Sequence, residues 1–260
     1  MNILDTIIKS KKAEIAKRRL VTGIAELERQ EFFCRKTLSL KTFLRDETKS
    51  GIIAEFKRRS PSKGMINTEA DAAAVTRAYT NYGASCLSVL TDGDFFGGST
   101  EDLLAARVNK IPVLRKDFII DEYQLTESKA MGADVVLLIA ACLTPERVMQ
   151  LAGFAKQLEL EVLLEIHNEA ELQHICDEIE LVGVNNRDLK TFEVDIERSA
   201  ELGNKIPAGK LRIAESGIRD TATIKFLKES GFTGFLMGER FMKENDPGEA
   251  FRLFVESLKY

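Results

Sequence analysis

The sequence predicts a closed (β/α)8 barrel, a TIM barrel of the α/β class, with an N-terminal helical extension. Three observations predict this fold. After residue 50 the chain alternates short apolar runs with longer segments of helical periodicity, and it does so eight times. The apolar runs are continuous, which is typical of parallel strands covered by helices on both faces. The length of 260 residues also matches one α/β barrel.

Residues 1–48 are the predicted extension, packed on a single barrel domain that makes residues 1–260 one unit. Apolar residues recur at helical spacing in "LDTIIKSKKAEIAKRRL", with lysines and arginines on the other side, and "IAELERQ" continues the pattern. A basic amphipathic helix can bind a membrane surface or a partner, but acidic residues interrupt this basic run. We therefore expect an extra helix that packs on the barrel, connected to the first strand through "KTFLRD".

Eight strands are expected in the order "GIIAEFK", "CLSVLTD", "PVLRKDF", "DVVLLIA", "EVLLEIH", "LVGVNNR", "LRIAESG" and "GFLMGE". A helical segment follows each strand; the fifth is "EAELQHICDEIE" and "DPGEAFRLFVESL" closes the chain. Several helices begin with Thr or Asp at the N-cap, and Pro145 follows Thr144 at the favoured first helical position. An open doubly wound sheet is the alternative, but no GxGxxG follows the first strand and the units divide the length evenly.

Composition limits the class of function. The chain is 44% hydrophobic and 30% charged with a net charge of −4, as expected of a soluble globular protein, and nothing favours nucleic acid. It has no run of about 18 apolar residues and no signal peptide, so we expect a cytoplasmic protein without membrane contact. The four cysteines are widely separated and read as buried thiols rather than as a zinc site or disulfide framework. His167 and His174 are poor indications of a metal, and His174 is expected on a helix surface.

Polar side chains collect at the C-terminal ends of the predicted strands, where barrels of this architecture have their active sites. They are Glu55, Lys57, Lys116, Glu165, Asn185, Arg187, Glu215 and Ser216. An unpaired charge in an apolar run is costly, so we expect these groups to converge and satisfy one another. A polar network that only plugs the barrel mouth is one interpretation. Acid-base catalysis is the other, with pKa values that neighbouring groups move towards neutrality.

The last two strands indicate an anionic ligand. "AESGI" and "FLMGE" each have a glycine where the strand ends, and the loops after strands seven and eight of barrels commonly bind phosphate. Backbone N–H groups at Gly217 and Gly238 can approach an anion closely, helped by the N-terminus of a following short helix. The sequence therefore predicts a phosphorylated small-molecule substrate.

These motifs resemble one known family. "IIAEFKRRSPSKG", "VLRKDFI", "LLEIHN", "VGVNNRDL", "IAESGI" and "FLMGE", in this order, resemble indole-3-glycerol-phosphate synthase of tryptophan biosynthesis, and the resemblance runs from the extension to the last unit. It implies a carboxy-lyase that closes the ring of 1-(2-carboxyphenylamino)-1-deoxyribulose 5-phosphate. Carbon dioxide and water are released, and indole-3-glycerol phosphate is formed. The resemblance implies no cofactor and no metal.

The resemblance also implies a role for each matching residue. Lys116 is the implied general acid and Glu165 an acid-base partner, while Lys57 is expected to meet the anthranilate carboxylate and Glu55 to take part in proton transfer. Which of Glu55, Lys57 and Glu165 handles the dehydration proton stays open. The expected substrate-binding positions are Ser60, Asn185, Arg187, Glu215 and Ser216, and the expected phosphate-binding positions are Gly217, Gly238 and Glu239.

Glu239 departs from many relatives, which have a small hydroxyl residue at this position. Because a carboxylate repels a phosphate, we expect its side chain to point away and its backbone N–H to contribute. We expect Glu55 and Lys57 to pair in the empty site. "RRSPSKGMI" reads as a lid that excludes water, with a plain solvated loop as the alternative.

Two other functions stay open at this point. One is a different phosphosugar barrel, such as an isomerase; the other is a barrel that binds a phosphorylated ligand without turnover, or a scaffold that docks through the basic helix. The length accommodates one barrel, so we predict a monofunctional enzyme and expect a monomer.

Overall fold

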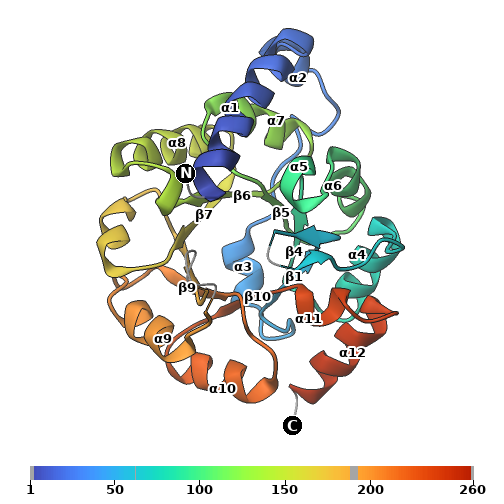
Figure 1. Cartoon of the computed structure of the whole chain (residues 1–260), viewed down its shortest axis with the longest axis vertical. Coiled ribbons are helices and arrows are strands. Elements are labelled where there is room, and N and C mark those ends of the chain that lie inside the picture. Colours follow the sequence, from blue (N-terminus) through green and yellow to red (C-terminus); the bar gives the residue numbers. More distant parts are fainter. Residues whose placement is uncertain (1–2, 62, 188–192, 259–260) are drawn as a thin grey trace.

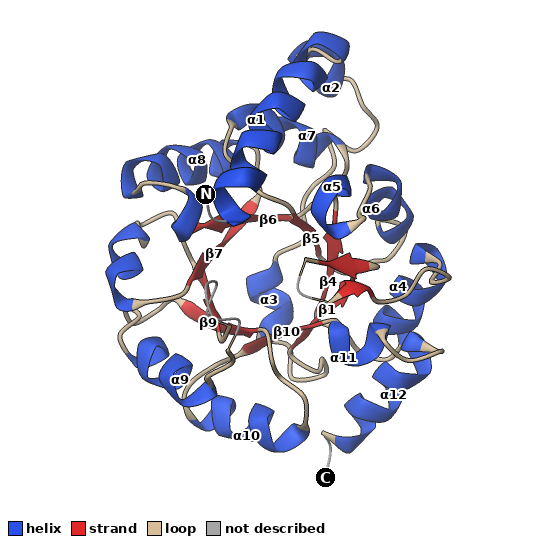
Figure 2. Ribbon diagram, viewed as in Figure 1, coloured by secondary structure: helices blue, strands red, loops and turns tan. Residues whose placement is uncertain are grey.

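A computed structural model describes residues 3–61, 63–187 and 193–258. Within these residues, parallel strands close into a barrel in the order β1-β4-β5-β6-β7-β8-β9-β10, surrounded by helices (Figures 1 and 2). The predicted fold class is confirmed. The barrel strands are β1 (Ile52–Phe56), β4 (Cys86–Leu90), β5 (Val113–Lys116), β6 (Val135–Ile139), β7 (Glu161–Ile166), β8 (Leu181–Asn185), β9 (Leu211–Glu215) and β10 (Gly234–Met237).

Helices connect the strands on the outside of the barrel. They begin where the sequence predicts, because Asp or Thr side chains accept hydrogen bonds from the first free backbone N–H groups; Thr144 caps α8, with Pro145 as its first residue. The outer helices are α4 (Ala72–Asn81), α5 (Gly93–Phe96), α6 (Thr100–Ala106), α7 (Glu122–Ala130), α8 (Pro145–Gln157), α9 (Ile196–Asn204), α10 (Thr221–Glu229), α11 (Glu239–Met242) and α12 (Pro247–Ser257), with the 3-10 turns η1 (Ala140–Cys142) and η2 (Glu169–His174).

One predicted helix is shorter than expected. "EAELQHICDEIE" forms only η2, and the surface position expected for His174 is wrong, because the side chain is buried. Its Nδ1 lies 3.0 Å from the carbonyl oxygen of Glu171, the acceptor that Ile175 would use in a continuing α-helix. Its Nε2 lies 3.0 Å from the carbonyl oxygen of Leu143. The imidazole therefore ends the helix and ties it to the turn after β6.

The extension consists of α1 (Ile3–Val21), α2 (Ile24–Leu27) and α3 (Leu40–Leu44). Helix α3 lies in "KTFLRD", as the connection to the first strand, and Leu40 and Leu44 pack with the residues that fill the barrel interior. Gly234, at the start of β10, approaches Leu44, so α3 closes the N-terminal end of the barrel. Helix α1 lies at the opposite rim, beside α7 and α8 (Figure 1). The expectation of a helix that packs on the barrel is confirmed.

Side chains alternate along each barrel strand. Ile53, Leu114, Leu163 and Ile213 point into the barrel and are fully buried, whereas their neighbours in the sequence pack against the helices. The interior is therefore filled below the rim, and open space remains only above it. No helix of the described part of the chain is long and apolar enough to cross a membrane.

Candidate active site

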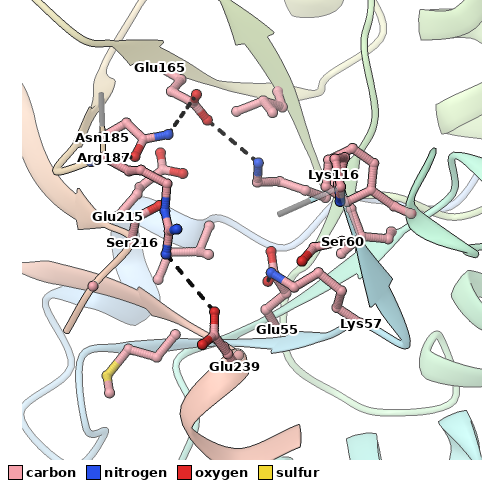
Figure 3. Close-up of a pocket in the computed structure, with 18 of the residues that line it drawn as sticks. Glu55, Lys57, Ser60, Lys116, Glu165, Asn185, Arg187, Glu215, Ser216 and Glu239 are labelled. Atoms are coloured by element: carbon pink, nitrogen blue, oxygen red, sulfur yellow. Dashed lines mark hydrogen bonds and ion pairs between the residues drawn. The ribbon is translucent and has the colours of Figure 1, made fainter. Parts of the chain in front are cut away.

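A cavity of about 470 Å³ opens at the C-terminal ends of the strands. All of the site residues predicted from the sequence line it: Glu55, Lys57, Ser60, Lys116, Glu165, Asn185, Arg187, Glu215, Ser216, Gly217, Gly238 and Glu239. Figure 3 shows the labelled side chains arranged around one open space. Residues from six strands and their loops therefore meet at a single rim, as the sequence predicts.

Lys116 and Glu165 face each other across the cavity. Lys116 is the last residue of β5, and its Nζ lies 3.5 Å from Oε2 of Glu165 near the end of β7. The other oxygen, Oε1, accepts a hydrogen bond from Nδ2 of Asn185 at 3.1 Å. Figure 3 shows Glu165 between these two partners. The carboxylate is therefore held by groups from two other strands.

Charge in the cavity raises the pKa of Lys116 above its ordinary value. Burial alone would lower this pKa, but the carboxylates of Glu165, Glu215 and Glu55 outweigh it. For Glu165 the balance is reversed: burial alone would raise its pKa, whereas Lys116 and His167 lower it. In the empty site this lysine is therefore an ammonium and this glutamate a carboxylate. The expectation that neighbours move these two pKa values towards neutrality is wrong.

Glu55 and Lys57 form an ion pair between Oε1 and Nζ, which confirms their expected pairing in the empty site. They share a face because residues two apart in a strand point the same way. Glu55 is buried and Lys57 is partly exposed at the cavity edge. Gly238 comes close to them, since a Cβ there would lie 2.7 Å from Cβ of Glu55. The end of β10 and the carboxylate of β1 are thus in direct contact.

Glu215 is the carboxyl group whose pKa does move towards neutrality. It is only 2% exposed, and its Oε1 has no hydrogen-bond partner in the described residues. Burial, and next the carboxylate of Glu165, raise its pKa to about 8. The side chain lies against Gly183 of β8, where a Cβ would overlap with Oε1 of Glu215. A glycine at 183 is therefore required to make room for a protonated carboxyl group.

The turn after β9 has an unusual backbone. Ser216 and Gly217 both adopt the left-handed region, with φ of 68° and 71°, and Ser216 is one of two described non-glycine residues with positive φ. Nδ2 of Asn186 donates a hydrogen bond of 2.7 Å to the carbonyl oxygen of Ser216. A Cβ at position 217 would overlap with the side chain of Val194. Such strained turns, held by neighbouring groups, are typical of functional sites.

The side chain of Glu239 faces the cavity, and its turning away from a bound phosphate stays a prediction. One carboxylate oxygen lies 4.0 Å from Nη2 of Arg187 (Figure 3). The other lies 3.9 Å from Nζ of Lys63. The two cations attract it. Glu239 thus neutralises the basic groups at the end of the site that the glycine turns border.

The segment "RRSPSKGMI" forms a small hairpin at the cavity edge, made of β2 (Arg59–Ser60) and β3 (Gly64–Met65). Residue 62 lies outside the described residues, as do residues 188–192, which include the end of the motif "VGVNNRDL". Nε of Arg59 donates to the carbonyl oxygen of Phe95 at 3.2 Å, and Arg58 pairs with Asp102. The segment is therefore anchored to the next βα unit. The closing movement of a lid stays a prediction.

An apolar wall of the cavity was not predicted. It consists of Ile7 from α1, with Phe96 and Phe118, whose ring centroids are 6.0 Å apart. Phe118 follows Lys116 by two residues, and this spacing is the signal that could have identified it. The contribution of α1 has no such signal. The wall gives the site an apolar surface in addition to its charged groups.

Helix α1 is fixed at the rim by a buried lysine. Nζ of Lys11 lies 2.9 Å from Oδ2 of Asp92 and 3.0 Å from Oδ1 of Asp117, and all three side chains are almost fully buried. Asp92 follows β4, and Asp117 follows Lys116 directly. This cluster connects the extension to two strand ends of the site.

The described residues contain no group of three or more His, Cys, Asp or Glu side chains with the arrangement of a metal site. The charged groups of the cavity instead alternate in sign, with lysines next to glutamates. Such an arrangement can donate and accept protons around a bound organic substrate.

Comparison with known proteins identifies the family. A model of indole-3-glycerol phosphate synthase matches residues 4–254. The chain is 46% identical over 259 residues to the indole-3-glycerol phosphate synthase of Bacteroides thetaiotaomicron, with 99% of each chain covered. The proteins of the same name from Polaromonas sp. and Salinibacter ruber are each 42% identical, over 96% and 100% of this chain and 96% and 97% of their own lengths.

The chain belongs to the indole-3-glycerol phosphate synthase family. The predicted resemblance is confirmed over nearly the whole length, including the helical extension. Its activity is that of a carboxy-lyase in tryptophan biosynthesis. The cavity at the strand ends offers acids, bases and an apolar surface.

Proposed function

We propose that this chain converts 1-(2-carboxyphenylamino)-1-deoxyribulose 5-phosphate to indole-3-glycerol phosphate, carbon dioxide and water. The observation that carries the proposal is one cavity that is lined by Lys57 and Lys116, by the glutamates at the ends of β1, β7 and β9, and by the glycine turns after β9 and β10. The family membership supports the same reaction. An isomerase of a phosphosugar without an aromatic ring would not need the apolar wall of Phe96 and Phe118.

Lys116 is proposed as the general acid of ring closure. The aromatic carbon that bears the carboxylate attacks the ketone carbon, and the ketone oxygen becomes a hydroxyl as it takes the proton from Nζ. A raised pKa keeps this proton on the lysine at neutral pH until the oxygen becomes strongly basic in the transition state. An ammonium in a cavity shielded from water also stabilises the developing negative charge.

Lys57 and Ser60 are proposed to hold the substrate carboxylate. Both line the cavity on the side of β1, and Lys57 exchanges its ion pair with Glu55 for one with the substrate. Loss of carbon dioxide restores the aromatic ring, so this step requires orientation of the carboxylate and the ring more than acid-base chemistry. The apolar wall keeps the ring flat against Phe96 and Phe118.

Glu165 is proposed as the base of the last step. Dehydration removes the hydroxyl as water and then a proton from carbon, and an ionised carboxylate is able to accept that proton. Glu55 and Glu215 are further candidates to move protons. Because Glu215 has a pKa of about 8, it is protonated at neutral pH and can donate to the departing hydroxyl.

The phosphate is proposed to bind at the turns that contain Ser216, Gly217 and Gly238. Their backbone N–H groups and the guanidinium of Arg187 offer donors to its oxygens. Arg219 and Lys243 also line this end of the cavity. Glu239 would then give up its contact with Arg187 and contribute only its backbone N–H.

The experiment is replacement of Lys116 by Ala, with Lys156→Ala on the exposed side of α8 as the control. Indole fluorescence measures turnover, and titration with product measures binding. We expect Lys116→Ala to lose at least about 100-fold in kcat, as is typical when a general acid is removed, while product still binds. A wild type that binds product without turnover would instead make the chain a binding protein. The expected absence of cofactor and metal, the monomeric state and the cytoplasmic location stay predictions.

A further inference from the structure

His167 lies directly beside the proposed base, and the reaction scheme above gives it no role. It follows Glu165 by two residues at the end of β7, so both side chains point to the same side. Nε2 of the imidazole lies 3.1 Å from Oε1 of Glu165, close but not aligned as a hydrogen bond. The residue is only 9% exposed. A buried ring in this position needs an explanation.

A second carboxylate holds the other side of the ring. Nδ1 of His167 lies 3.4 Å from Oε2 of Glu171. Glu171 is fixed in turn, because it accepts hydrogen bonds of 2.7 Å from the backbone N–H of His167 and from Nδ2 of Asn168. The side chains of Glu165, His167 and Glu171 thus form a chain from the cavity to the start of η2.

This arrangement determines the charge of the ring. A neutral imidazole has one N–H, so it would turn a lone pair towards one of the two carboxylates. An imidazolium offers an N–H to each of them. Burial alone would lower the pKa of His167, but Glu165 and Glu171 outweigh it and raise the pKa to about 10. The ring therefore carries a positive charge at neutral pH.

Other charged and titratable groups surround Glu165 as well. Lys116 of β5 is its other cationic neighbour. Glu215 of β9 is a neighbouring carboxyl group, and Glu55 of β1 acts on Lys116 and Glu215. Cys142 of η1 is also close to Glu165. Its pKa is raised to about 12 by burial and then by the carboxylates of Glu165, Glu171 and Asp5, so this thiol is neutral. Two cations thus hold Glu165 ionised, and one of them is the group that gives its proton away in the proposed reaction.

We propose that His167, as an imidazolium held by Glu171, is a positioning residue that keeps Glu165 ionised and correctly oriented after Lys116 has protonated the substrate. Transfer of a proton from Nζ to the ketone oxygen leaves Lys116 neutral, so Glu165 loses its first counter-charge. The imidazolium remains, and Glu165 stays a carboxylate able to accept the carbon-bound proton in the last step. This inference rests on the role proposed above for Glu165.

The chain offers a matched control for this proposal. His167 and His174 are its only histidines, and both are buried. Among the described residues, the ring nitrogens of His174 have only backbone carbonyl oxygens as hydrogen-bond partners. The variants are His167→Gln, Glu171→Gln and, as the control, His174→Gln. For each we would measure kcat and KM from pH 3 to 9 by indole fluorescence, because the lowered pKa of Glu165 places the acid limb below pH 4.5, together with the melting temperature.

His167→Gln should lower kcat about tenfold or more, with KM changed less than about twofold. It should also move the acid limb of the kcat profile up by about one pH unit, because loss of a nearby opposite charge raises a carboxyl pKa by this amount or more. Glu171→Gln should move the limb in the same direction by less. His174→Gln should leave the limb in place even if it melts earlier. An acid limb unmoved in both His167→Gln and Glu171→Gln, or a loss of kcat that merely follows the melting temperature, would overturn the proposal.

A spectroscopic measurement does not depend on activity. His174→Gln leaves one histidine, so the ring nitrogens of His167 can be observed alone by 15N NMR. At pH 8 both nitrogens should carry a proton, and a neutral ring would contradict the proposal. A wild type that forms no indole product would remove the proposed function itself. Normal turnover in the wild type with an unaffected His167→Gln variant would remove only the role of His167.

Discussion

Replacement of Glu239 by Ser should strengthen substrate binding. In the empty site its carboxylate lies 4.0 Å from Nη2 of Arg187 and 3.9 Å from Nζ of Lys63, at the end of the cavity where we propose that the phosphate binds. The incoming phosphate has to compete with this carboxylate for the same cations. Removal of Glu239 ends that competition and the repulsion between two anions.

The size of the effect follows from distance and exposure. Opposite charges about 4 Å apart interact by ~1 kcal/mol in water and by ~4 kcal/mol at an effective dielectric constant of about 20. The side chain of Glu239 is 43% exposed, so the lower figure applies. A gain of about 1 kcal/mol corresponds to a KM about fivefold lower. The gain should shrink as salt is added, because exposed charges are screened.

The assay measures KM for the substrate and the inhibition constant for inorganic phosphate, at low and high ionic strength. Glu229→Gln is the matched control, because Glu229 is exposed at the end of α10 and does not line the cavity. Both constants should fall in Glu239→Ser and stay unchanged in Glu229→Gln. A KM that is unchanged or raised in Glu239→Ser would refute the reasoning and would mean that the carboxylate helps to orient Arg187.

Three further predictions concern the groups around the cavity. Gly183→Ala should lower kcat by about 100-fold, because the new methyl group takes the space of the Glu215 carboxyl, whereas Gly153→Ala, where a Cβ meets nothing within 4 Å, should leave kcat unchanged in the same assay. As the pH rises from about 4.5 to 8, the free energy of unfolding of the wild type should fall relative to that of Glu215→Gln, by up to ~1.4 kcal/mol per pH unit. The reason is that the raised pKa of Glu215 makes the folded state bind more protons than the unfolded state in this range. Parallel pH profiles of the two proteins in urea denaturation would contradict this prediction. Asp134→Asn should lower the free energy of unfolding, measured by guanidinium denaturation, by about 3 kcal/mol, because this fully buried carboxylate pairs with Arg35 and Arg107. A loss below about 1 kcal/mol would contradict this and would show that the amide satisfies the same partners.

The barrel could be predicted from the sequence because each strand and each helix has a recognisable local sequence pattern. Continuous apolar runs such as residues 135–139 and caps such as Thr144 are properties of a few neighbouring residues. The rim could be predicted for a related reason: in a parallel barrel all strands end on the same side, so Lys116 and Glu165 had to meet there.

The remaining features depend on contacts between distant segments. Lys11 is indistinguishable in the sequence from the exposed lysines around it, yet its partners Asp92 and Asp117 bury it completely. The orientation of Glu239 depends on Arg187 and Lys63, which come from other βα units. The direction in which the pKa of Lys116 shifts likewise depends on the acidic residues around it, and these come from several strands, so no single motif predicts the shift.

The surroundings of His167 could be predicted from the sequence only in part. Its position two residues after Glu165 is visible in the sequence, and strand geometry puts both side chains on one face. The second carboxylate, Glu171, lies four residues further on and reaches the ring only because the chain turns sharply into η2 instead of continuing as a strand. The sequence therefore predicts that His167 lies beside Glu165, whereas the contact between His167 and Glu171 depends on the turn.

The central claim is that this one cavity carries out ring closure, decarboxylation and dehydration with its own side chains. The most direct test is turnover of 1-(2-carboxyphenylamino)-1-deoxyribulose 5-phosphate by the purified wild type, measured by indole fluorescence in the presence of a strong chelator. We predict full activity, equal to that without chelator. No indole product, with or without the chelator and with or without added divalent metal, would contradict the account.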